Sequence, residues 1–220
     1  MKLPFSTRSV GAILPWQRSE DAVEQQDPYV TRIKSLVYQA AWYFLVYSFV
    51  GWVWEVFYAI LERHRFENRG FLFGPLCPIY GVMLVLIISF YHYCKKNWIV
   101  FFFASATVVT LTELITGTFI EYYFGRRLWS YIGWPLNVKG YICIPVSVFW
   151  GLGAVMVVKF IHPRVHKLVS KIPKENGKVI LYAIFFLIAV DLALTITISL
   201  GFRPYHQISE FLVRNLRLGA

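Results

Sequence analysis

The chain has 220 residues, of which 57% are apolar and 19% aromatic, and only 15% carry a charge. Soluble domains carry about 25% charged residues, so this composition excludes an ordinary soluble domain and favours a protein embedded in lipid. The net charge of +10 comes from 22 Lys and Arg residues that lie almost entirely between the apolar runs, a pattern that excludes a nucleic-acid groove and fits contact with anionic membrane lipids.

Residues 1–35 are predicted to be a polar tail, because charges, prolines and glutamines leave no apolar core of signal-peptide length. The first predicted membrane span covers residues 36–61 and contains a single charge, Glu55. The second covers residues 71–94. Two prolines lie within residues 73–78 at its start, so we expect its first turns to be irregular and to face the inside of the protein.

Three further spans are predicted over residues 98–124, 141–161 and 179–202, each long enough to cross the hydrocarbon core. In residues 203–220 apolar side chains recur at helical spacing opposite two arginines, which predicts a short amphipathic helix on the membrane surface. The predicted fold class is therefore all-α: a polytopic membrane protein, a bundle of five transmembrane helices with a short C-terminal interfacial helix.

Five crossings place the two chain termini on opposite sides of the membrane. The side that holds the N-terminal tail carries twelve Lys and Arg residues, whereas the other side carries nine. Basic residues are enriched in cytoplasmic loops, so this count predicts a cytoplasmic N-terminus.

Three acidic residues lie inside predicted spans: Glu55, Glu113 and Asp191. No Lys or Arg lies at comparable depth along the sequence. An ionised carboxylate at the centre of a spanning helix costs about 2.5 to 3.5 kcal/mol on insertion scales, so each acid must be protonated, hydrated or paired. These acids are the main indication of a functional site.

The third span carries a stripe of small and polar residues at steps of three and four, made of Ala106, Thr110, Glu113, Gly117 and Glu121. Such stripes are typical of faces where membrane helices approach closely. We therefore expect Glu113 and Glu121 to face the interior of the bundle.

Basic partners for these acids are predicted in two loops on one side of the membrane. Arg69 follows Asn68 in one loop, and Lys139 follows Asn137 in the other, each shortly before a glycine. The likeness of the two turns suggests a repeated pair of helices with a site where the turns meet. The candidate substrate-binding residues are Glu55, Asn68, Arg69, Glu113, Glu121, Asn137 and Lys139.

The sequence indicates no metal site and no cofactor. Its three cysteines form no CxxC pair, and His162 and His166 flank Pro163 at a basic membrane edge, where contact with the interface is expected. The phosphate-binding pattern GxxxxGK[ST] does not occur, so an ATP-driven step would need a separate ATPase or other membrane subunit.

Four motifs carry a family resemblance between residues 48 and 163. They are residues 51–55 (Gly-Trp-Val-Trp-Glu), residues 68–81, residues 113–121 and residues 149–151 (Phe-Trp-Gly). On these motifs the chain resembles the bacterial membrane family named Putative ABC-transporter type IV, or CmpB-like permeases, to which the animal transmembrane 229 proteins are also similar. The resemblance implies a transport permease in a bacterial plasma membrane.

Three functions fit these observations. The leading hypothesis is a protein that transports or handles a small solute, in which Glu55 and Glu113 hold a proton or a cationic group while Asn68 and Arg69 orient the solute. One alternative is a membrane-embedded enzyme acting on a lipid or lipid-linked substrate, with Glu55 or Glu113 as general base. The other is a structural or assembly partner in a membrane complex, in which the acids only bond helices together.

Overall fold

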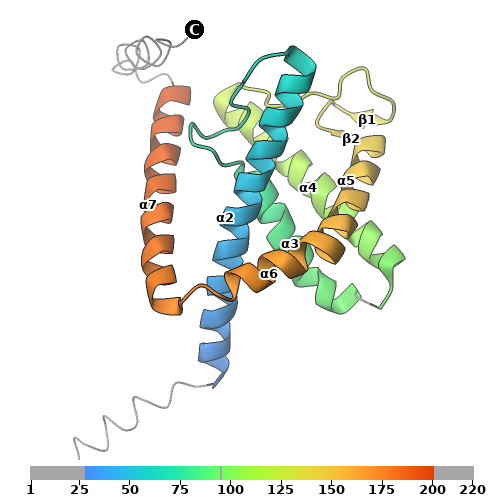
Figure 1. Ribbon diagram of the computed structural model, residues 1–220. Coiled ribbons are helices and arrows are strands. Elements are labelled where there is room, and N and C mark those ends of the chain that lie inside the picture. The colour runs from blue at the N-terminus through green and yellow to red at the C-terminus, as the bar shows by residue number, and fades with distance from the viewer. Residues whose placement is uncertain (1–27, 95, 201–220) are drawn as a thin grey trace, which may run out of the picture. The chain divides into compact units, whose positions relative to one another are not determined.

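The computed structural model describes residues 28–94 and 96–200, which are mostly helical (Figure 1). The helices are α2 (Pro28–Arg63), α3 (Pro78–Cys94), α4 (Trp98–Phe124), α5 (Ile144–Met156), the π-helical turn η1 (Val157–Ile161), α6 (His162–Val169) and α7 (Lys174–Ser199). Two short strands, β1 (Asn137–Val138) and β2 (Ile142–Cys143), form a hairpin between α4 and α5. Most of the predicted polar tail and the whole predicted surface helix at residues 203–220 lie outside the described residues.

The chain divides into two compact units after Tyr38. The described part of the first unit, residues 28–38, is helical. The second unit holds the remaining described helices and all of the contacts that form the candidate site.

Four helical stretches are long and apolar enough to cross a membrane: α2, α4, the continuous stretch Ile144–Val169, and α7. The helix α3 is apolar but has 17 residues, about 26 Å at 1.5 Å per residue, against a hydrocarbon core of about 30 Å. The fold is therefore that of a helical membrane protein with four candidate spans and a shorter apolar helix. A fifth crossing, with the orientation that depends on it, stays a prediction.

The start of the second predicted span is irregular, as its two prolines predict. Residues 71–77 form no helix, and α3 begins at Pro78, where proline is tolerated because the first N–H of a helix has no partner within the helix. The backbone of this segment finds partners elsewhere: the Cys77 N–H donates to the Ser48 carbonyl over 3.0 Å. This satisfies a requirement of any non-helical backbone within a bilayer.

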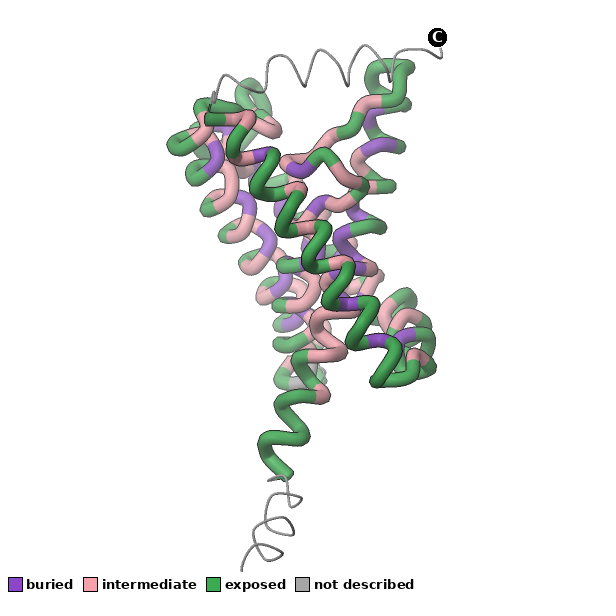
Figure 2. The backbone as a smooth tube through the Cα atoms, turned by 90° about the vertical axis from the view of Figure 1, so that its left-hand side faces the viewer, coloured by how far each residue is buried: buried purple, intermediate pink, exposed green. Residues whose placement is uncertain are grey.

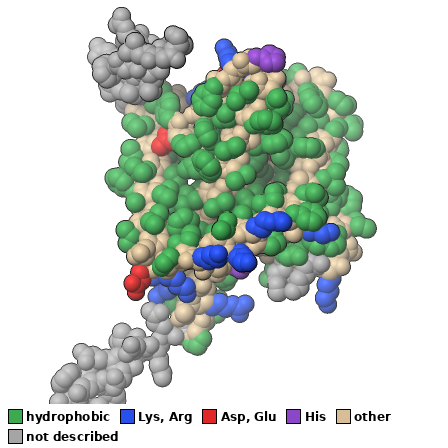
Figure 3. Space-filling model, in the orientation of Figure 1, with side chains coloured by type: hydrophobic (Ala, Val, Ile, Leu, Met, Phe, Trp, Pro, Cys, Tyr) green, Lys and Arg blue, Asp and Glu red, His purple; other side chains and the backbone are tan. Residues whose placement is uncertain are grey.

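The fourth predicted span ends at residue 161, whereas the helix continues through η1 and α6 to Val169. Pro163 offers a physical reason for the π-helical turn, since it lacks an N–H and its ring crowds the carbonyl four residues earlier. Widening the turn before it relieves that conflict. Basic side chains gather along the edge of the molecule where α6 and the start of α7 lie (Figure 3).

Glycines allow α2 and α3 to pack closely. A Cβ atom on Gly51 would lie 2.4 Å from the Tyr80 ring, and one on Gly81 would lie 2.2 Å from Ser48 Oγ. Small residues at such positions let membrane helices gain dispersion contacts along their backbones. The main buried cluster of the second unit lies farther along α3, α4 and α5, and consists of Met83, Ile87, Phe101, Val109, Ala154 and Val158.

The helix α7 is exposed over most of its surface (Figure 2). Its buried residues are Gly177, Leu181 and Thr195. The apolar side chains of its exposed surface suit contact with lipid, because lipid tails are as apolar as the side chains themselves.

The hairpin β1–β2 was not predicted. Its turn places Lys139 at φ 51° and Gly140 at φ 76°, and the Tyr141 N–H donates to the Val138 carbonyl over 3.0 Å. Tight hairpin turns need positive φ at both central residues. Lysine is uncommon in that conformation. Of the two central residues, only Gly140 therefore indicated a tight turn in the sequence.

Candidate functional site

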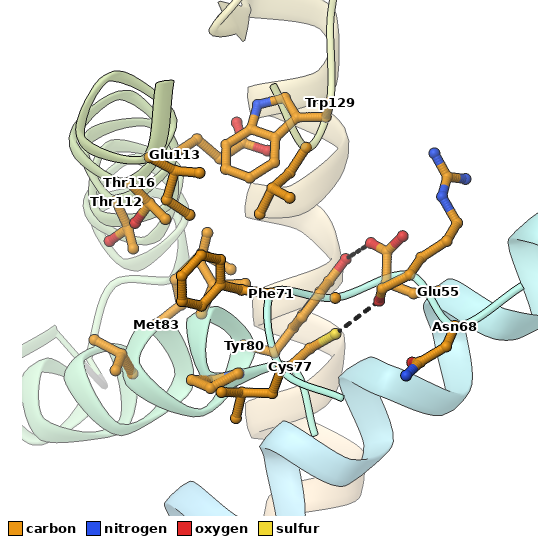
Figure 4. A pocket seen from close by; sticks show the side chains of 18 of the residues that line it. Glu55, Asn68, Phe71, Cys77, Tyr80, Met83, Thr112, Glu113, Thr116 and Trp129 are labelled. Carbon is orange, nitrogen blue, oxygen red and sulfur yellow. Dashed lines mark hydrogen bonds between the residues drawn. The ribbon is translucent and has the colours of Figure 1, made fainter. Parts of the chain in front are cut away.

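A cavity of about 730 Å³ lies between α2, α3 and α4 and the loops of residues 64–77 and 125–143 (Figure 4). Four of the predicted site residues line it, namely Glu55, Asn68, Arg69 and Glu113. The other three, Glu121, Asn137 and Lys139, are not among its lining residues. The structure thus brings together two of the acids that the sequence placed inside the membrane.

Glu55 comes from α2 and is half-buried. Its Oε1 accepts a hydrogen bond of 2.6 Å from the Tyr80 hydroxyl, in the first turn of α3 (Figure 4). The Tyr80 ring in turn meets Trp150 of α5 edge-on, with 5.8 Å between the ring centroids. The partner of Glu55 is therefore a phenol on the neighbouring helix and not one of the predicted basic residues.

Glu113 comes from α4 and is only 7% exposed. Its Oε1 accepts a hydrogen bond of 3.1 Å from the Tyr131 hydroxyl, whereas its buried Oε2 has no hydrogen-bond partner among the described residues. Burial and the nearby Glu113 carboxylate raise the pKa of Tyr131 well above its ordinary value, so this phenol stays a neutral donor. Glu113 thus has one acceptor atom free at the wall of the cavity.

Figure 4 shows Glu55 and Glu113 on different walls, with Phe71 and Tyr80 between them in the view. The two carboxyl groups come from helices that are separate in the sequence, so each can act on a different part of one bound molecule. The walls between them are mainly aromatic and aliphatic, as is usual for small-molecule sites that use a few polar groups to fix orientation.

Arg69 turns towards protein groups. One of its Nη atoms lies 3.3 Å from Glu62 Oε2, and its guanidinium lies 5.4 Å from the centroid of the Tyr58 ring. The side chain of Arg69 keeps 22% of its surface exposed. It therefore lines the cavity with a charge that Glu62 already offsets in part.

Asn68 has both ends of its side-chain amide occupied. Its Oδ1 accepts from Trp52 Nε1 over 2.7 Å, and its Nδ2 donates to the Phe73 carbonyl over 2.7 Å. Asn68 therefore ties Trp52 of α2 to the irregular segment and shapes the cavity wall.

Glu121 pairs with Arg127 in a two-pronged ion pair, with distances of 2.7 and 2.9 Å between nitrogen and oxygen atoms. The Arg127 guanidinium also lies 4.9 Å from the centroid of the Tyr141 ring. Arginine matches carboxylates in this geometry and stacks on aromatic rings. The pair fixes the loop after α4 to the end of that helix.

Asn137 closes its own turn, because its Oδ1 accepts from the Gly140 N–H over 3.1 Å. Lys139 is exposed. Residues 68–70 have neither a strand nor a positive φ, so the two asparagine turns follow unlike backbone paths. This difference removes the argument for a repeated site where the turns meet.

One local feature is common to the two loops. The Cys77 thiol donates to the Arg69 carbonyl over 3.2 Å, and the Cys143 thiol donates to the Pro135 carbonyl over 3.3 Å. Both cysteines are buried, and each reaches back eight residues just before a helix begins. They act as structural thiols that hold the loops against the helix starts.

Asp191, the third acid of the spans, binds backbone and not a basic side chain. Its two carboxylate oxygens accept from the Phe73 N–H over 3.0 Å and from the Gly74 N–H over 2.8 Å. Thr195 adds a weaker hydrogen bond of 3.3 Å. Asp191 therefore anchors α7 to the irregular segment that forms one wall of the cavity.

Sequence reasoning missed the aromatic residues that complete the cavity, namely Tyr80, Trp129, Tyr131 and Trp150. Tyr80 and Trp150 do lie in the motifs that carry the family resemblance. One general rule could have found the tyrosines: a buried carboxyl group needs a hydrogen-bond donor, and tyrosine is a neutral donor that membrane interiors tolerate.

His162 and His166 face α2. His162 Nδ1 and the Tyr47 hydroxyl are 2.9 Å apart in one hydrogen bond, and His166 Nδ1 bonds the Tyr43 hydroxyl. In the described part of the chain no group of three or more metal-ligating side chains comes together. The histidines fasten the start of α6 to α2.

The fold defines an integral membrane protein of the helical type. The sequence profile of the family described as Putative ABC-transporter type IV matches residues 42–196. Because the match covers more than half of the chain, the protein belongs to this family, and the resemblance seen in the sequence motifs is confirmed. No curated protein and no solved structure matched the chain.

Proposed function

We propose that the protein binds a small polar solute in the cavity and handles it as a transporter component does. Glu55 and Glu113 hold a proton or a cationic group of the solute, while Arg69 and Asn68 shape the mouth. The observation that carries this proposal is the buried Glu113 carboxyl group, which lines a cavity and leaves one oxygen without a hydrogen bond. Intramembrane carboxyl groups of this kind are typical of substrate and proton pathways.

The cavity supports this function over the two alternatives. A purely structural role predicts a dry seam in which both oxygens of each acid bond a neighbouring helix, and Glu113 does not fit that description. An enzyme acting on lipid phosphate needs a free cation beside the base. Arg69 is engaged by Glu62, and Arg126 follows the end of α4, thirteen residues after Glu113 in the chain. The transporter class of the family adds independent support.

A separate subunit would supply any energy from ATP. The family description supports association with an ATPase or another membrane protein, and the chain has no phosphate-binding loop of its own. The count of basic residues supports a cytoplasmic N-terminus, and membrane lipids surround the exposed apolar faces.

Binding, which needs no energy source, gives the first test. The purified protein in phosphatidylcholine nanodiscs is dialysed against a defined mixture of amino acids, polyamines, sugars and small phosphates, and retained solutes are identified by mass spectrometry. The wild type is expected to retain at least one class of solute. The double variant Glu55→Gln/Glu113→Gln is expected to bind it at least about tenfold more weakly, since a hydrogen bond to a charged group contributes about 1.5 to 3 kcal/mol.

The matched control is Glu175→Gln, the same chemical change at an exposed position in the first turn of α7, away from the cavity. It should bind like the wild type. Equal retention by the double variant, or no retained solute at all in the wild type, would contradict the proposed function.

A further inference from the structure

The lining of the cavity contains seven charged side chains, and four of them are held in ion pairs. The three ion pairs Arg63–Glu67, Arg69–Glu62 and Arg127–Glu121 occupy three of its four arginines. Besides Glu55, of which Tyr80 bonds only Oε1, two charged groups have hydrogen-bonding capacity left over. They are Glu113, with its free Oε2, and Arg126, which makes no hydrogen bond or ion pair with any residue that the structure describes.

These two groups lie at different depths of the same cavity. Glu113 is buried near the middle of α4, whereas Arg126 is exposed two residues after that helix ends at Phe124. The helix rises by about 17 Å between Glu113 and Phe124. A ligand that uses both groups is therefore expected to be extended, with its two charges farther apart than those of an α-amino acid.

The surface between the two groups suits an apolar chain. Glu113, Thr116 and Ile120 follow steps of three and four on α4, and all three line the cavity, so they share one face that leads towards Arg126. Phe71 and Leu128 add apolar walls from the two loops. The cavity of about 730 Å³ lies within the range of small-molecule sites, about 300 to 1,000 Å³, and is far larger than a single ion requires.

The inner end of the cavity suits an ammonium group. An acceptor oxygen that is buried and unbonded calls for an N–H or O–H donor. Aromatic rings, whose faces attract cations, also line the cavity. Trp129 is one of them, and its Nε1 donates to the Tyr141 carbonyl over 3.0 Å, which fixes the ring.

We propose that the cavity recognises an extended zwitterion, whose ammonium group bonds Glu113 Oε2 and whose carboxylate or phosphate group pairs with Arg126 at the rim. The chain that joins the two charges lies along the face of Glu113, Thr116 and Ile120. This inference rests on the proposed function, since it specifies the class of solute that the same cavity takes.

The test is a ladder of ω-amino acids of increasing length: 4-aminobutanoate, 6-aminohexanoate and 8-aminooctanoate. Calorimetry measures the affinity of each for the full chain in phosphatidylcholine nanodiscs. Affinity is expected to rise at least about tenfold from the shortest to the longest, because the shortest is too short to engage both charges and the two longer members engage both. Hexylamine and hexanoate, which each carry one charge, should bind more weakly than 6-aminohexanoate, and the N-trimethyl form of 8-aminooctanoate should bind more weakly than its parent because it has no N–H.

Two variants locate the ends of the ligand. Arg126→Gln should abolish the advantage of 6-aminohexanoate over hexylamine, while Arg65→Gln, in the rim loop but outside the cavity lining, should preserve it. Glu113→Gln should weaken all ligands that carry an ammonium group. If Glu113→Gln fails to fold, Thr116→Phe provides the second test, because it should block the long ligand and spare 4-aminobutanoate, with the exposed Thr118→Phe as control.

O-phosphoethanolamine distinguishes a free extended solute from a lipid headgroup, because its two charges are close together. Binding of this short zwitterion as tightly as 8-aminooctanoate would overturn the inference, as would affinity that is independent of length, an unchanged preference in Arg126→Gln, or no binding of the ladder at all. If the protein retains solutes of another class, and this retention depends on Glu55 and Glu113, the proposed function stands and only the inference of a zwitterionic ligand is contradicted. If the protein retains no solute at all, both the proposed function and this inference are contradicted.

Discussion

Replacing Gly81 by alanine is expected to push α2 and α3 apart and to lower the free energy of unfolding by about 3 kcal/mol, at the upper end of the usual cost of overpacking. The added Cβ would lie 2.2 Å from Ser48 Oγ and 2.6 Å from the Phe44 carbonyl oxygen. The carbonyl belongs to the helix backbone and cannot rotate away, so the helices themselves must move. Tryptophan fluorescence during unfolding in mixed lipid and detergent micelles measures the change.

The matched control is Gly153→Ala in α5. The nearest atom to its added Cβ is Trp150 Cε3 at 3.9 Å, an ordinary van der Waals distance. Alanine is favoured over glycine within a helix by about 1 kcal/mol, so this variant should be as stable as the wild type or slightly more stable. Similar losses at Gly81 and Gly153 would show that close helix approach is not the cause.

Removing the Asp191 carboxylate is expected to release the irregular segment of residues 71–77 from α7. In Asp191→Ala the N–H groups of Phe73, which is exposed, and of Gly74, which is half-buried, lose a charged acceptor, and a hydrogen bond to a charged group contributes about 1.5 to 3 kcal/mol. We expect the free energy of unfolding to fall by about 3 kcal/mol. Cys77, which is buried at the end of the same segment, should then react faster with maleimide, as measured by mass spectrometry of the alkylated peptides.

Thr197→Val provides the control on the same helix. The Thr197 hydroxyl bonds only the Ala193 carbonyl one turn earlier and is exposed, so its loss should change neither stability nor the reactivity of Cys77. An Asp191→Ala variant that alkylates at the wild-type rate would show that the segment is held by other contacts.

The sequence determined the membrane class and most of the helices. Apolar runs of spanning length are a property of composition, and the bilayer admits few structures other than helices. Hydropathy alone therefore located α2, α4, the helix of residues 144–169 and α7, with ends that differ from the predicted ones by up to eight residues. Proline, whose ring restricts the backbone and removes an N–H donor, gave further information: the prolines at positions 75 and 78 predicted the irregular segment before α3. The sequence also showed three acidic residues within the predicted spans, and the free-energy cost of a charge in the bilayer indicated that each needs a partner.

Only the tertiary structure decided what those partners are. Basic loop residues were expected, yet Glu55 bonds Tyr80, Glu113 bonds Tyr131, and Asp191 bonds the backbone of a segment 117 residues away. A neutral phenol or a backbone N–H leaves no charge pattern in the sequence. Which donor reaches a carboxylate depends on how helices that are distant in the chain pack against one another, and the exposed arginines find nearer acids, as Arg127 does in Glu121.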